Sequence, residues 1–381
     1  MCNQQHSRET NATAGKTVPV SAAVGMVLAH DITEIRKDEF KGRAFKKGHI
    51  ICLEDIVHLK RLGKEHLFVL SLAPDEMHED DAACALAAAL MGTGVRAEGE
   101  PKEGKVNIVA EHDGLLYVNR QALLEFNMLG EVMCAARHSY SLVKKDRVVA
   151  GTRAVPLVVK RGVIDEATGI CEKARAVGKP VVEVKELRKP KVGVVITGNE
   201  VYHGQIKDAF APVISKKIEA FKGEIVGLYY APDDTAIIEQ RLRELLDAGA
   251  DLLLTTGGMS VDPDDVTRFA IRNIGAKDVT YGAAVLPGAM FLVGYIEKVQ
   301  RSELPVQSRK TPGREAPTMN LIPILGIPAC GMYHSVTILD LMMPRVLAGE
   351  KIGRRELAEL GHGGLCLHCK ECRYPVCPFG K

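Results

Sequence analysis

The fold is decided by a stretch that runs from KVGVVITG (191–198) through DAFAPVISKKIEAF (208–221), EIVGLYYAP (224–232) and TAIIEQRLRELLDAG (235–249) to DLLLTTGG (251–258). The strand candidates are continuous apolar runs, which is the pattern of a parallel sheet covered on both faces. Each connection is long enough for a crossover helix. The stretch therefore predicts a three-layer α/β/α domain with a mostly parallel sheet.

The pattern continues towards the C-terminus. PDDVTRFAIRNIG (263–275) predicts a helix, and MFLVGYIE (290–297) and LIPILGIP (321–328) predict two further strands. A last helix is expected from about residue 332 to residue 347. The polar segment 301–318 contains three prolines and is expected to be an exposed loop.

Towards the N-terminus the elements become shorter. Alternating apolar residues predict a small β-rich domain and then an α+β unit, with hairpins expected over 105–119, turning at Asp113-Gly114, and over 148–159, turning through Gly151. The charged stretch 184–191 is the expected linker to the α/β domain. The predicted segments are a disordered tail (1–15), a small β-rich domain (16–75), an α+β domain (76–188), the α/β domain (190–352) and a Cys-rich tail (353–381).

Composition limits the function classes. Lysine plus arginine (50) nearly balance aspartate plus glutamate (48), so no overall field favours nucleic acid or an acidic membrane surface. No apolar run approaches the roughly 18 to 20 residues that cross a bilayer, and the first residues lack the apolar core of a secretory signal. We expect a soluble cytoplasmic protein in which the scattered cysteines are reduced thiols.

Small and polar residues follow three of the predicted strands. Thr197 to Glu200 follow the first strand, Thr255 to Ser260 follow the third, and Gly326 to Ala329 follow the last. In open parallel sheets, ligands bind outside the carboxyl ends of the strands. Glycine lets the backbone approach a ligand, and N–H groups at a helix start form an anion site. The three turns together outline one candidate pocket.

These turns carry a family resemblance. TTGGMSVDPDDVTR (255–268) resembles the TGG-x-S-x-G-x-x-D-x-T motif of the molybdopterin-binding domain shared by molybdopterin adenylyltransferases and molybdotransferases. TGNEVYHGQIKD (197–208) resembles that family's TGDE…G-Q-I element, and VLPGAMFLVGY (285–295) resembles its PGKPF-x-x-G segment. GIPACG (326–331) lies where GLPGNP is usual. The resemblance covers about residues 190–350, and residues 16–75 look more loosely like the extra domains of molybdotransferases.

The resemblance implies a ligand and its contacts. The ligand is molybdopterin or its adenylated form, and Asp265 is implied as a catalytic acidic residue that holds Mg²⁺ near the phosphates or the oxyanion. The alternative for Asp265 is a carboxylate in the first turn of a helix, where it stabilises the helix dipole. The implied cofactor-binding residues are Thr197, Gly198, Asn199, Glu200, Thr256, Gly257, Gly258, Met259, Ser260, Gly288, Gly326 and Pro328.

The sequence also departs from the family pattern. Asn199 stands where an aspartate is usual, which removes a charge and a potential Mg²⁺ ligand. Ala289 and Met290 stand where PGKP would supply a lysine. Binding of the pterin would tolerate these losses better than transferase catalysis.

The tail carries a second motif. Cys366-x₂-Cys369-x₂-Cys372-x₄-Cys377-Pro378 places four thiols within twelve residues. Four thiolates satisfy the ligand count of Zn²⁺ or of an iron–sulfur cluster, and the spacing does not decide between them. The run resembles the bacterial ferredoxin pattern except for one extra residue in its last gap. The tail lies outside the βαβ units, so we expect the α/β domain to stay folded without it.

Two functions follow as hypotheses. The first is molybdopterin binding in molybdenum-cofactor biosynthesis, with molybdate insertion by a molybdotransferase as the expected reaction. The second is a non-catalytic carrier or sensor of the cofactor with a redox or zinc tail. The sequence leaves open whether the protein is an enzyme. The expected partners are the pterin and molybdate, further copies of the chain in a homo-oligomer, and a molybdoenzyme to which it docks.

Overall fold

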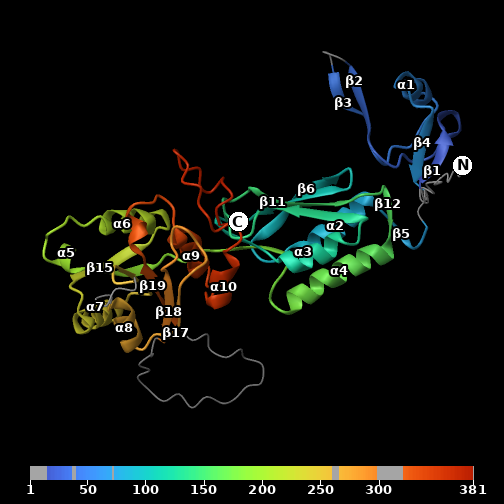
Figure 1. Ribbon diagram of the computed structural model, residues 1–381. Helices are drawn as coiled ribbons and strands as arrows, with labels where there is room; N and C mark the ends of the chain where they lie inside the picture. The colour runs from blue at the N-terminus through green and yellow to red at the C-terminus, as the bar shows by residue number, and fades with distance from the viewer. Residues whose placement is uncertain (1–14, 37–39, 71–72, 260–265, 298–320, 381) are drawn as a thin grey trace, which may run out of the picture. The chain divides into compact units, whose positions relative to one another are not determined.

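The computed structural model describes residues 15–36, 40–70, 73–259, 266–297 and 321–380 (Figure 1). The chain divides into two compact units. Unit 1 comprises residues 1–139 and 143–185, and unit 2 comprises residues 140–142 and 186–381. The division between Lys185 and Glu186 falls inside the predicted linker. The finer boundaries within each unit stay predictions.

Unit 2 is built on one six-stranded sheet with the order β15-β14-β16-β19-β18-β17. Strands β15, β14, β16 and β19 are parallel to one another, β18 is antiparallel to β19, and β17 is antiparallel to β18. The strands are β14 (Lys191–Thr197), β15 (Glu224–Ala231), β16 (Leu252–Thr256), β17 (Lys277–Tyr281), β18 (Leu292–Glu297) and β19 (Leu321–Ile327).

Helices cover both faces of this sheet (Figure 1). Helices α6 (Phe210–Ala220) and α9 (Ile338–Leu347) share one core cluster with the sheet. Helices α7 (Thr235–Asp247) and α8 (Thr267–Asn273) share another cluster with it. The prediction of a three-layer α/β/α domain with a mostly parallel sheet is therefore confirmed.

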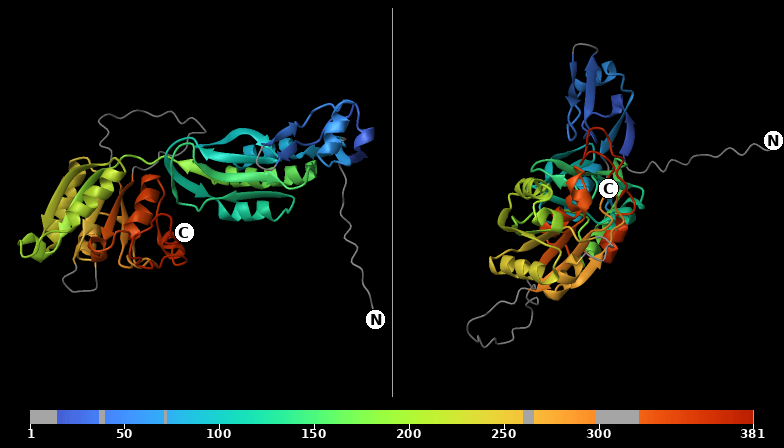
Figure 2. Two further views of the ribbon diagram at one scale, coloured as in Figure 1. Left: turned by 90° about the horizontal axis from the view of Figure 1, so that it is seen from above. Right: turned by 60° about the vertical axis from the view of Figure 1, so that its left-hand side comes forward.

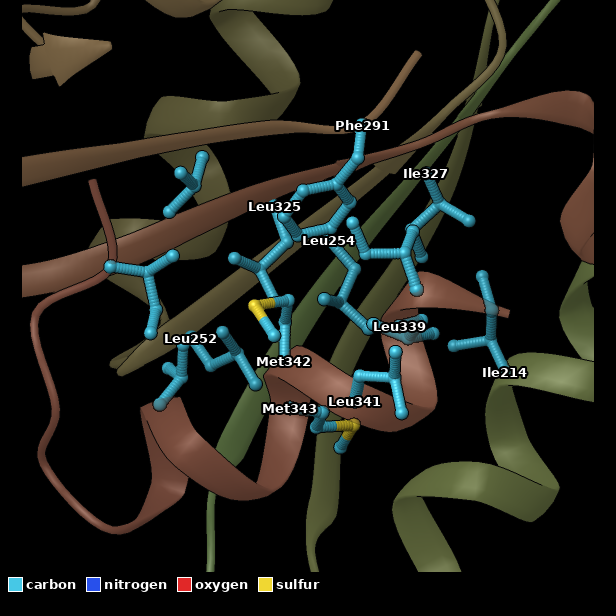
Figure 3. Close-up of a cluster of buried hydrophobic side chains, with 14 of the residues drawn as sticks. Ile214, Leu252, Leu254, Phe291, Leu325, Ile327, Leu339, Leu341, Met342 and Met343 are labelled. Atoms are coloured by element: carbon cyan, nitrogen blue, oxygen red, sulfur yellow. The ribbon is translucent and has the colours of Figure 1, made fainter. Parts of the chain in front are cut away.

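The larger core cluster lies between the sheet and α9. Figure 3 shows Phe291 and Leu254 on the sheet side of this cluster and Met342 on the helix side. All three side chains are fully buried. Burying a side chain of this size contributes about 1.5 to 3 kcal/mol, so the cluster fixes the sheet against its helices.

Helix α7 illustrates how the local sequence forms these elements. The side chain of Asp234 caps the helix by accepting a hydrogen bond from the N–H of Ile237 at 3.0 Å. Ile238, Leu242 and Leu245 recur at spacings of four and three residues, and all three are buried. This spacing places them on one face of the helix, which packs on the sheet.

The C-terminal tail packs into the core of unit 2. Leu357 is fully buried and Phe379 is 4% exposed in the same cluster as α9. The expectation that the domain stays folded without the tail is therefore not supported.

Unit 2 also contains three short elements. They are α5 (Asn199–Tyr202), η2 (Ala329–Met332) and α10 (Arg354–Glu359).

Unit 1 begins with a small β-rich part that has its own core around Leu28, Ile32 and Leu59. Strand β1 pairs with β4, and β2 pairs with β3, both antiparallel. The elements are β1 (Gly15–Pro19), η1 (Val20–Ala22), β2 (Ile32–Arg36), β3 (Phe40–Phe45), α1 (Asp55–Arg61) and β4 (His66–Leu70).

The second part of unit 1 contains a four-stranded sheet, β6-β7-β11-β9, and two smaller sheets, β12-β5 and β10-β8-β13, of which only Leu142 in β10 is assigned to unit 2. Helix α2 packs on β7 and β11, and α4 lies beside α2 (Figure 2). The strands are β5 (Glu76–His78), β6 (Val95–Lys102), β7 (Lys105–Ala110), β8 (Gly114–Val118), β9 (Val132–Ala136), β10 (Leu142–Val143), β11 (Val148–Ala154), β12 (Val158–Lys160) and β13 (Val182–Lys185). The helices are α2 (Glu79–Leu90), α3 (Arg120–Asn127) and α4 (Arg161–Ala176).

Two hairpins predicted in this part are wrong. Strands β7 and β8 flank the turn at Asp113-Gly114 but belong to different sheets, because β8 pairs with β13. Gly151 lies inside the continuous strand β11, where it pairs with Asn107 of β7. The residues Asp113-Gly114 correctly predicted the turn between β7 and β8, but they did not indicate that β8 pairs with β13.

None of the described helices has both the length and the apolar composition needed to cross a membrane.

Candidate functional site

The ends of the parallel strands meet at one edge of the unit 2 sheet. Thr197 at the end of β14 lies opposite Ala231 of β15, and Ile196 lies opposite Thr256 at the end of β16. Thr256 in turn lies opposite Ile327 of β19. The turns that begin at Gly198, Gly257 and Pro328 therefore leave the sheet at the same edge, as the strand pattern predicted.

The antiparallel strand β18 brings a fourth segment to this edge. Leu292, the first residue of β18, lies opposite Gly326 of β19. The segment that contains Gly288 immediately precedes β18. Gly288 has a φ of 134°, and a Cβ added there would lie 2.6 Å from Cγ2 of Ile338. Only glycine fits this close approach to α9.

Buried threonines connect the first two turns. The Thr197 hydroxyl donates to the carbonyl oxygen of Thr256 at 2.7 Å. Its Oγ1 also lies 3.1 Å from Oγ1 of Thr267, at the start of α8. Thr197 is 4% exposed, and Thr256 and Thr267 are fully buried. The three residues fix the ends of β14 and β16 relative to α8.

Gly257 and Gly258 pass close to these threonines. A Cβ on Gly257 would lie 2.4 Å from the carbonyl oxygen of Thr197, and a Cβ on Gly258 would lie 2.3 Å from Oγ1 of Thr267. Their φ values of 79° and 55° lie in the left-handed region. Any side chain here would meet both strain and a clash, so the turn requires two glycines.

Two buried hydroxyls near this edge lack a partner. Among the residues that the structure describes, Oγ1 of Thr256 is buried and has no hydrogen-bond partner, and the same holds for Thr255. A buried polar atom without a partner costs about 1 to 3 kcal/mol.

The first turn is held by a reciprocal pair of hydrogen bonds. The N–H of Asn199 donates to Oδ2 of Asp233 at 3.0 Å, and the N–H of Asp233 donates to Oδ1 of Asn199 at 3.2 Å. The Asn199 amide oxygen thus binds the loop after β15. Glu200, the next residue, is exposed and lies at the start of the short α5.

Several predicted site residues contribute packing. Met259 is 3% exposed, and a Cβ on Gly326 would lie 2.6 Å from Cε of Met259. Pro328 and Gly288 are also buried. These residues pack below the surface of the sheet edge. The predicted site residues that are at least partly exposed are Gly198, Asn199, Glu200, Gly257 and Gly258.

Two predicted site residues, Ser260 and Asp265, lie outside the described residues. Their roles in binding and catalysis stay predictions.

Sequence reasoning missed Thr267 and the contact between Arg268 and Tyr281. The guanidinium of Arg268 lies over the ring of Tyr281 at 4.8 Å, and the Tyr281 hydroxyl donates to the carbonyl oxygen of Met259. Thr267 is the last position of the quoted TGG motif, so a signal for it was present. Tyr281 belongs to β17, which the sequence analysis did not predict.

The third turn contains Cys330. Burial raises the pKa of the Cys330 thiol, which keeps it protonated near neutral pH. A protonated thiol is a poor nucleophile and a poor metal ligand. We therefore assign Cys330 to packing.

The four tail cysteines lie apart from the strand-end turns along the chain but share one cavity. Cys366, Cys369, Cys372 and Cys377 all line a cavity of about 240 Å³. Cys369 and Cys372 are exposed, and the other two are partly buried.

Two family models match the chain. The model described as "Probable molybdopterin binding domain" matches residues 193–347. The model described as "Domain of unknown function (DUF8806)" matches residues 17–71. The first match covers the α/β sheet and the turns at its edge.

Curated relatives carry two kinds of name. The molybdopterin molybdenumtransferase of Haemophilus influenzae is 31% identical over 132 residues, which is 33% of this chain and 32% of the relative. A CinA-like protein of Mycolicibacterium paratuberculosis is 28% identical over 123 residues, which is 32% of this chain and 28% of the relative. The chain thus matches about a third or less of the length of these relatives.

Solved structures align with part of the chain. The molybdopterin biosynthesis enzyme MoaB of Thermus thermophilus aligns with 42% of this chain and 98% of its own, at 20% identity and a TM-score of 0.32. The tungsten cofactor synthesizing protein MoaB of Pyrococcus furiosus aligns with 42% and 97%, at 18% identity and a TM-score of 0.29.

The residues that match the family model include the strands β14 and β16 and the glycine turns that follow them. The chain therefore contains, over residues 193–347, a domain of the family of probable molybdopterin-binding domains.

Proposed function

We propose that unit 2 binds molybdopterin, or its adenylated form, at the sheet edge that carries Gly198, Gly257 and Gly258. The observation that carries this proposal is the buried threonine network beneath the Gly257-Gly258 turn. Thr197, Thr256 and Thr267 hold the turn in one conformation, so its backbone N–H groups are preorganised for a phosphate-bearing ligand.

The match to the family of probable molybdopterin-binding domains supports a role of this binding in molybdenum-cofactor biosynthesis. The first candidate activity is insertion of molybdate into the bound pterin by a molybdotransferase. In this reaction Asp265 would hold Mg²⁺ beside the phosphates or the oxyanion, where the cation would offset the repulsion between the anions. Glu200, an exposed carboxylate of the first turn, would contribute to ligand binding.

A second candidate is a carrier or sensor that binds the cofactor without turnover. The pairing of Asn199 with Asp233 favours it, because the residue that replaces the usual aspartate is already engaged in holding a loop. Ala289 and Met290, in place of a lysine, leave that segment without an ammonium for phosphate or molybdate.

The binding proposal is tested by anaerobic titration of the full chain with molybdopterin. We expect Gly258→Ala to weaken binding by about tenfold or more, equivalent to about 1.4 kcal/mol, because its Cβ displaces Thr267. The matched control is Gly249→Ala. Gly249 also has a positive φ of 89°, but a Cβ there would meet open space at the opposite edge of the sheet. Equal affinities of the two variants would contradict the site assignment.

Turnover is tested separately. An anaerobic assay of molybdate insertion and of adenylation, with and without Mg²⁺, separates the two candidates. For a molybdotransferase, Asp265→Asn should lower the rate or its Mg²⁺ dependence more than the stability. A protein that binds the pterin and shows neither reaction supports the carrier.

Location and assembly complete the proposal. We place the protein in the cytoplasm, since the described cysteines are free thiols. We also propose a homo-oligomer that docks to a molybdoenzyme. Light scattering of the purified chain, alone and with a molybdoenzyme, tests both parts.

A further inference from the structure

Pterin binding leaves the C-terminal tail without a role. Its four cysteines nevertheless line a single cavity of about 240 Å³, which they share with His334 and His368. The two imidazole rings lie 4.9 Å apart. A concentration of four thiols and two imidazoles around one small cavity has the chemistry of a metal site.

The core of unit 2 anchors the backbone of this tail. The N–H of Leu286 donates to the carbonyl oxygen of Gly364 at 2.8 Å, and the N–H of Cys366 donates to that of Leu286 at 2.9 Å. At the other end, the N–H of Gly380 donates to the carbonyl oxygen of Gly363 at 2.9 Å. The segment from 363 to 380 is therefore a closed loop whose two ends meet.

Buried groups hold the same loop from the inside. Phe379 is 4% exposed in the core cluster beside α9, and Cys366 and Cys377 pack against that cluster. A Cβ on Gly364 would lie 2.3 Å from the carbonyl oxygen of Ala284, so the backbone there passes too close for any other residue. The first and last cysteines are thus positioned by the protein core before any metal binds.

The cavity that the four cysteines share favours one class of metal group. A single Zn²⁺ binds four thiolates at about 2.3 Å, which brings the sulfur atoms within about 3.8 Å of one another. In the described part of the chain, no three or more histidine, cysteine, aspartate or glutamate side chains are grouped to hold one metal ion. In a [4Fe–4S] cluster each thiolate binds its own iron, and bridging sulfides separate the irons. The cavity of about 240 Å³ that the four cysteines line has room for a cluster of several irons, which a single zinc ion would not fill.

From this geometry we propose that Cys366, Cys369, Cys372 and Cys377 bind one iron–sulfur cluster in the cavity of the tail. The four cysteines complete the ligand count without a histidine. His334 and His368 then belong to the surroundings of the cluster, where their hydrogen bonds and charge would tune its reduction potential.

The test uses the full chain, purified without oxygen and then supplied with ferrous iron and sulfide. We expect visible absorption that reduction with dithionite bleaches, and iron and acid-labile sulfide in equal amounts. Cys369→Ser and Cys372→Ser should each lose most of this absorption and most of the iron. Both side chains are exposed, so serine opens no cavity in the core, and far-ultraviolet circular dichroism checks that each variant is folded.

Two controls complete the design. Cys84→Ser alters an exposed cysteine on α2 of unit 1 and should retain the full iron and sulfide content. His368→Ala should retain the cluster and shift its reduction potential. Stoichiometric zinc without sulfide, or a chain that takes up neither iron nor sulfide, would overturn the proposal. Equal iron contents in folded Cys369→Ser and Cys84→Ser would also overturn it.

Discussion

The hydroxyl oxygens of Thr197 and Thr267 lie 3.1 Å apart in the interior of unit 2, although 70 residues separate them in the sequence. Thr197 ends the strand β14, and Thr267 begins the helix α8. Because the Thr197 hydroxyl already donates to Thr256, it accepts from Thr267. This direction of donation joins three separate segments beneath the Gly257-Gly258 turn.

Thr267→Val tests this relationship. Valine has nearly the same shape but removes the donor, so we expect a loss of about 1 to 2 kcal/mol in the free energy of unfolding and a several-fold weaker affinity for molybdopterin. Denaturant unfolding and pterin titration measure the two effects. Thr168→Val, at a partly exposed position on α4 of unit 1, is the control. Unchanged affinity in folded Thr267→Val would show that the network does not support the ligand.

Glu350→Gln should strongly destabilise unit 2. Arg345 is 2% exposed and donates to both carboxylate oxygens of Glu350, at 2.8 and 2.7 Å. Removing the carboxylate leaves a buried guanidinium without its counter-charge, which costs about 3 to 5 kcal/mol. Glu244→Gln removes a surface partner of Arg241 on α7 and should leave the unfolding midpoint nearly unchanged. Similar midpoints for the two variants would contradict this account.

Glu79 should make unit 1 less stable as the pH rises. Burial, with Asp80 as a second cause, raises the pKa of Glu79 to about 7 from its ordinary 4.5. The folded state therefore binds the proton more tightly. The stabilisation is fully present below pH 4.5 and is lost as the pH rises through 7, a change of about 3 kcal/mol. Comparing Glu79→Gln with the unmodified chain by unfolding between pH 5 and pH 8 isolates this contribution, and parallel pH profiles would refute it.

Phe379→Ala should show that the tail belongs to the core of unit 2. Phe379 is 4% exposed, and truncating a buried phenylalanine costs about 3 to 5 kcal/mol. Val376 lies three residues earlier and is 89% exposed, so Val376→Ala should change the stability little. Thermal unfolding of both variants, without added metal, measures the difference. Equal unfolding temperatures for Phe379→Ala and Val376→Ala would show that the tail does not contribute to the core of unit 2.

The sequence predicted the elements that repeat a strong local pattern. Strands β14, β15 and β16 are apolar runs, and α7 has clear helical spacing, so each is specified by its own residues. Strand β17 was missed because Lys277 and Asp278 are exposed and the strand pairs on one side only. Its formation depends on β18, which lies farther along the chain.

Helix α4 was missed for a different reason. Its buried residues are Ile164, Ala167, Cys171 and Ala174, at spacings of three and four. Three of them are small, so the apolar face is weak in the sequence and forms only by close packing on α2. The hairpin error had a related cause, since Tyr117 pairs with Glu183, a partner distant in sequence.

The candidate site was predictable as far as its strand ends. The rule that ligands bind beyond the carboxyl ends of parallel strands identified Gly198, Gly257 and Gly258. Thr267 and Asp233 could not be found in that way. Thr267 acts through a tertiary hydrogen bond, and Asp233 is recognised only by its reciprocal pairing with Asn199.

The most direct test of the central claim is the amount of pterin that the chain carries. The full chain, incubated anaerobically with molybdopterin and freed of unbound ligand, is denatured and oxidised, and the released fluorescent pterin is measured against the protein concentration. We predict an equimolar amount from the unmodified chain and from Gly249→Ala, and little from Gly258→Ala. Absence of pterin from the unmodified chain, or equal amounts from the two glycine variants, would contradict the claim that this sheet edge binds molybdopterin.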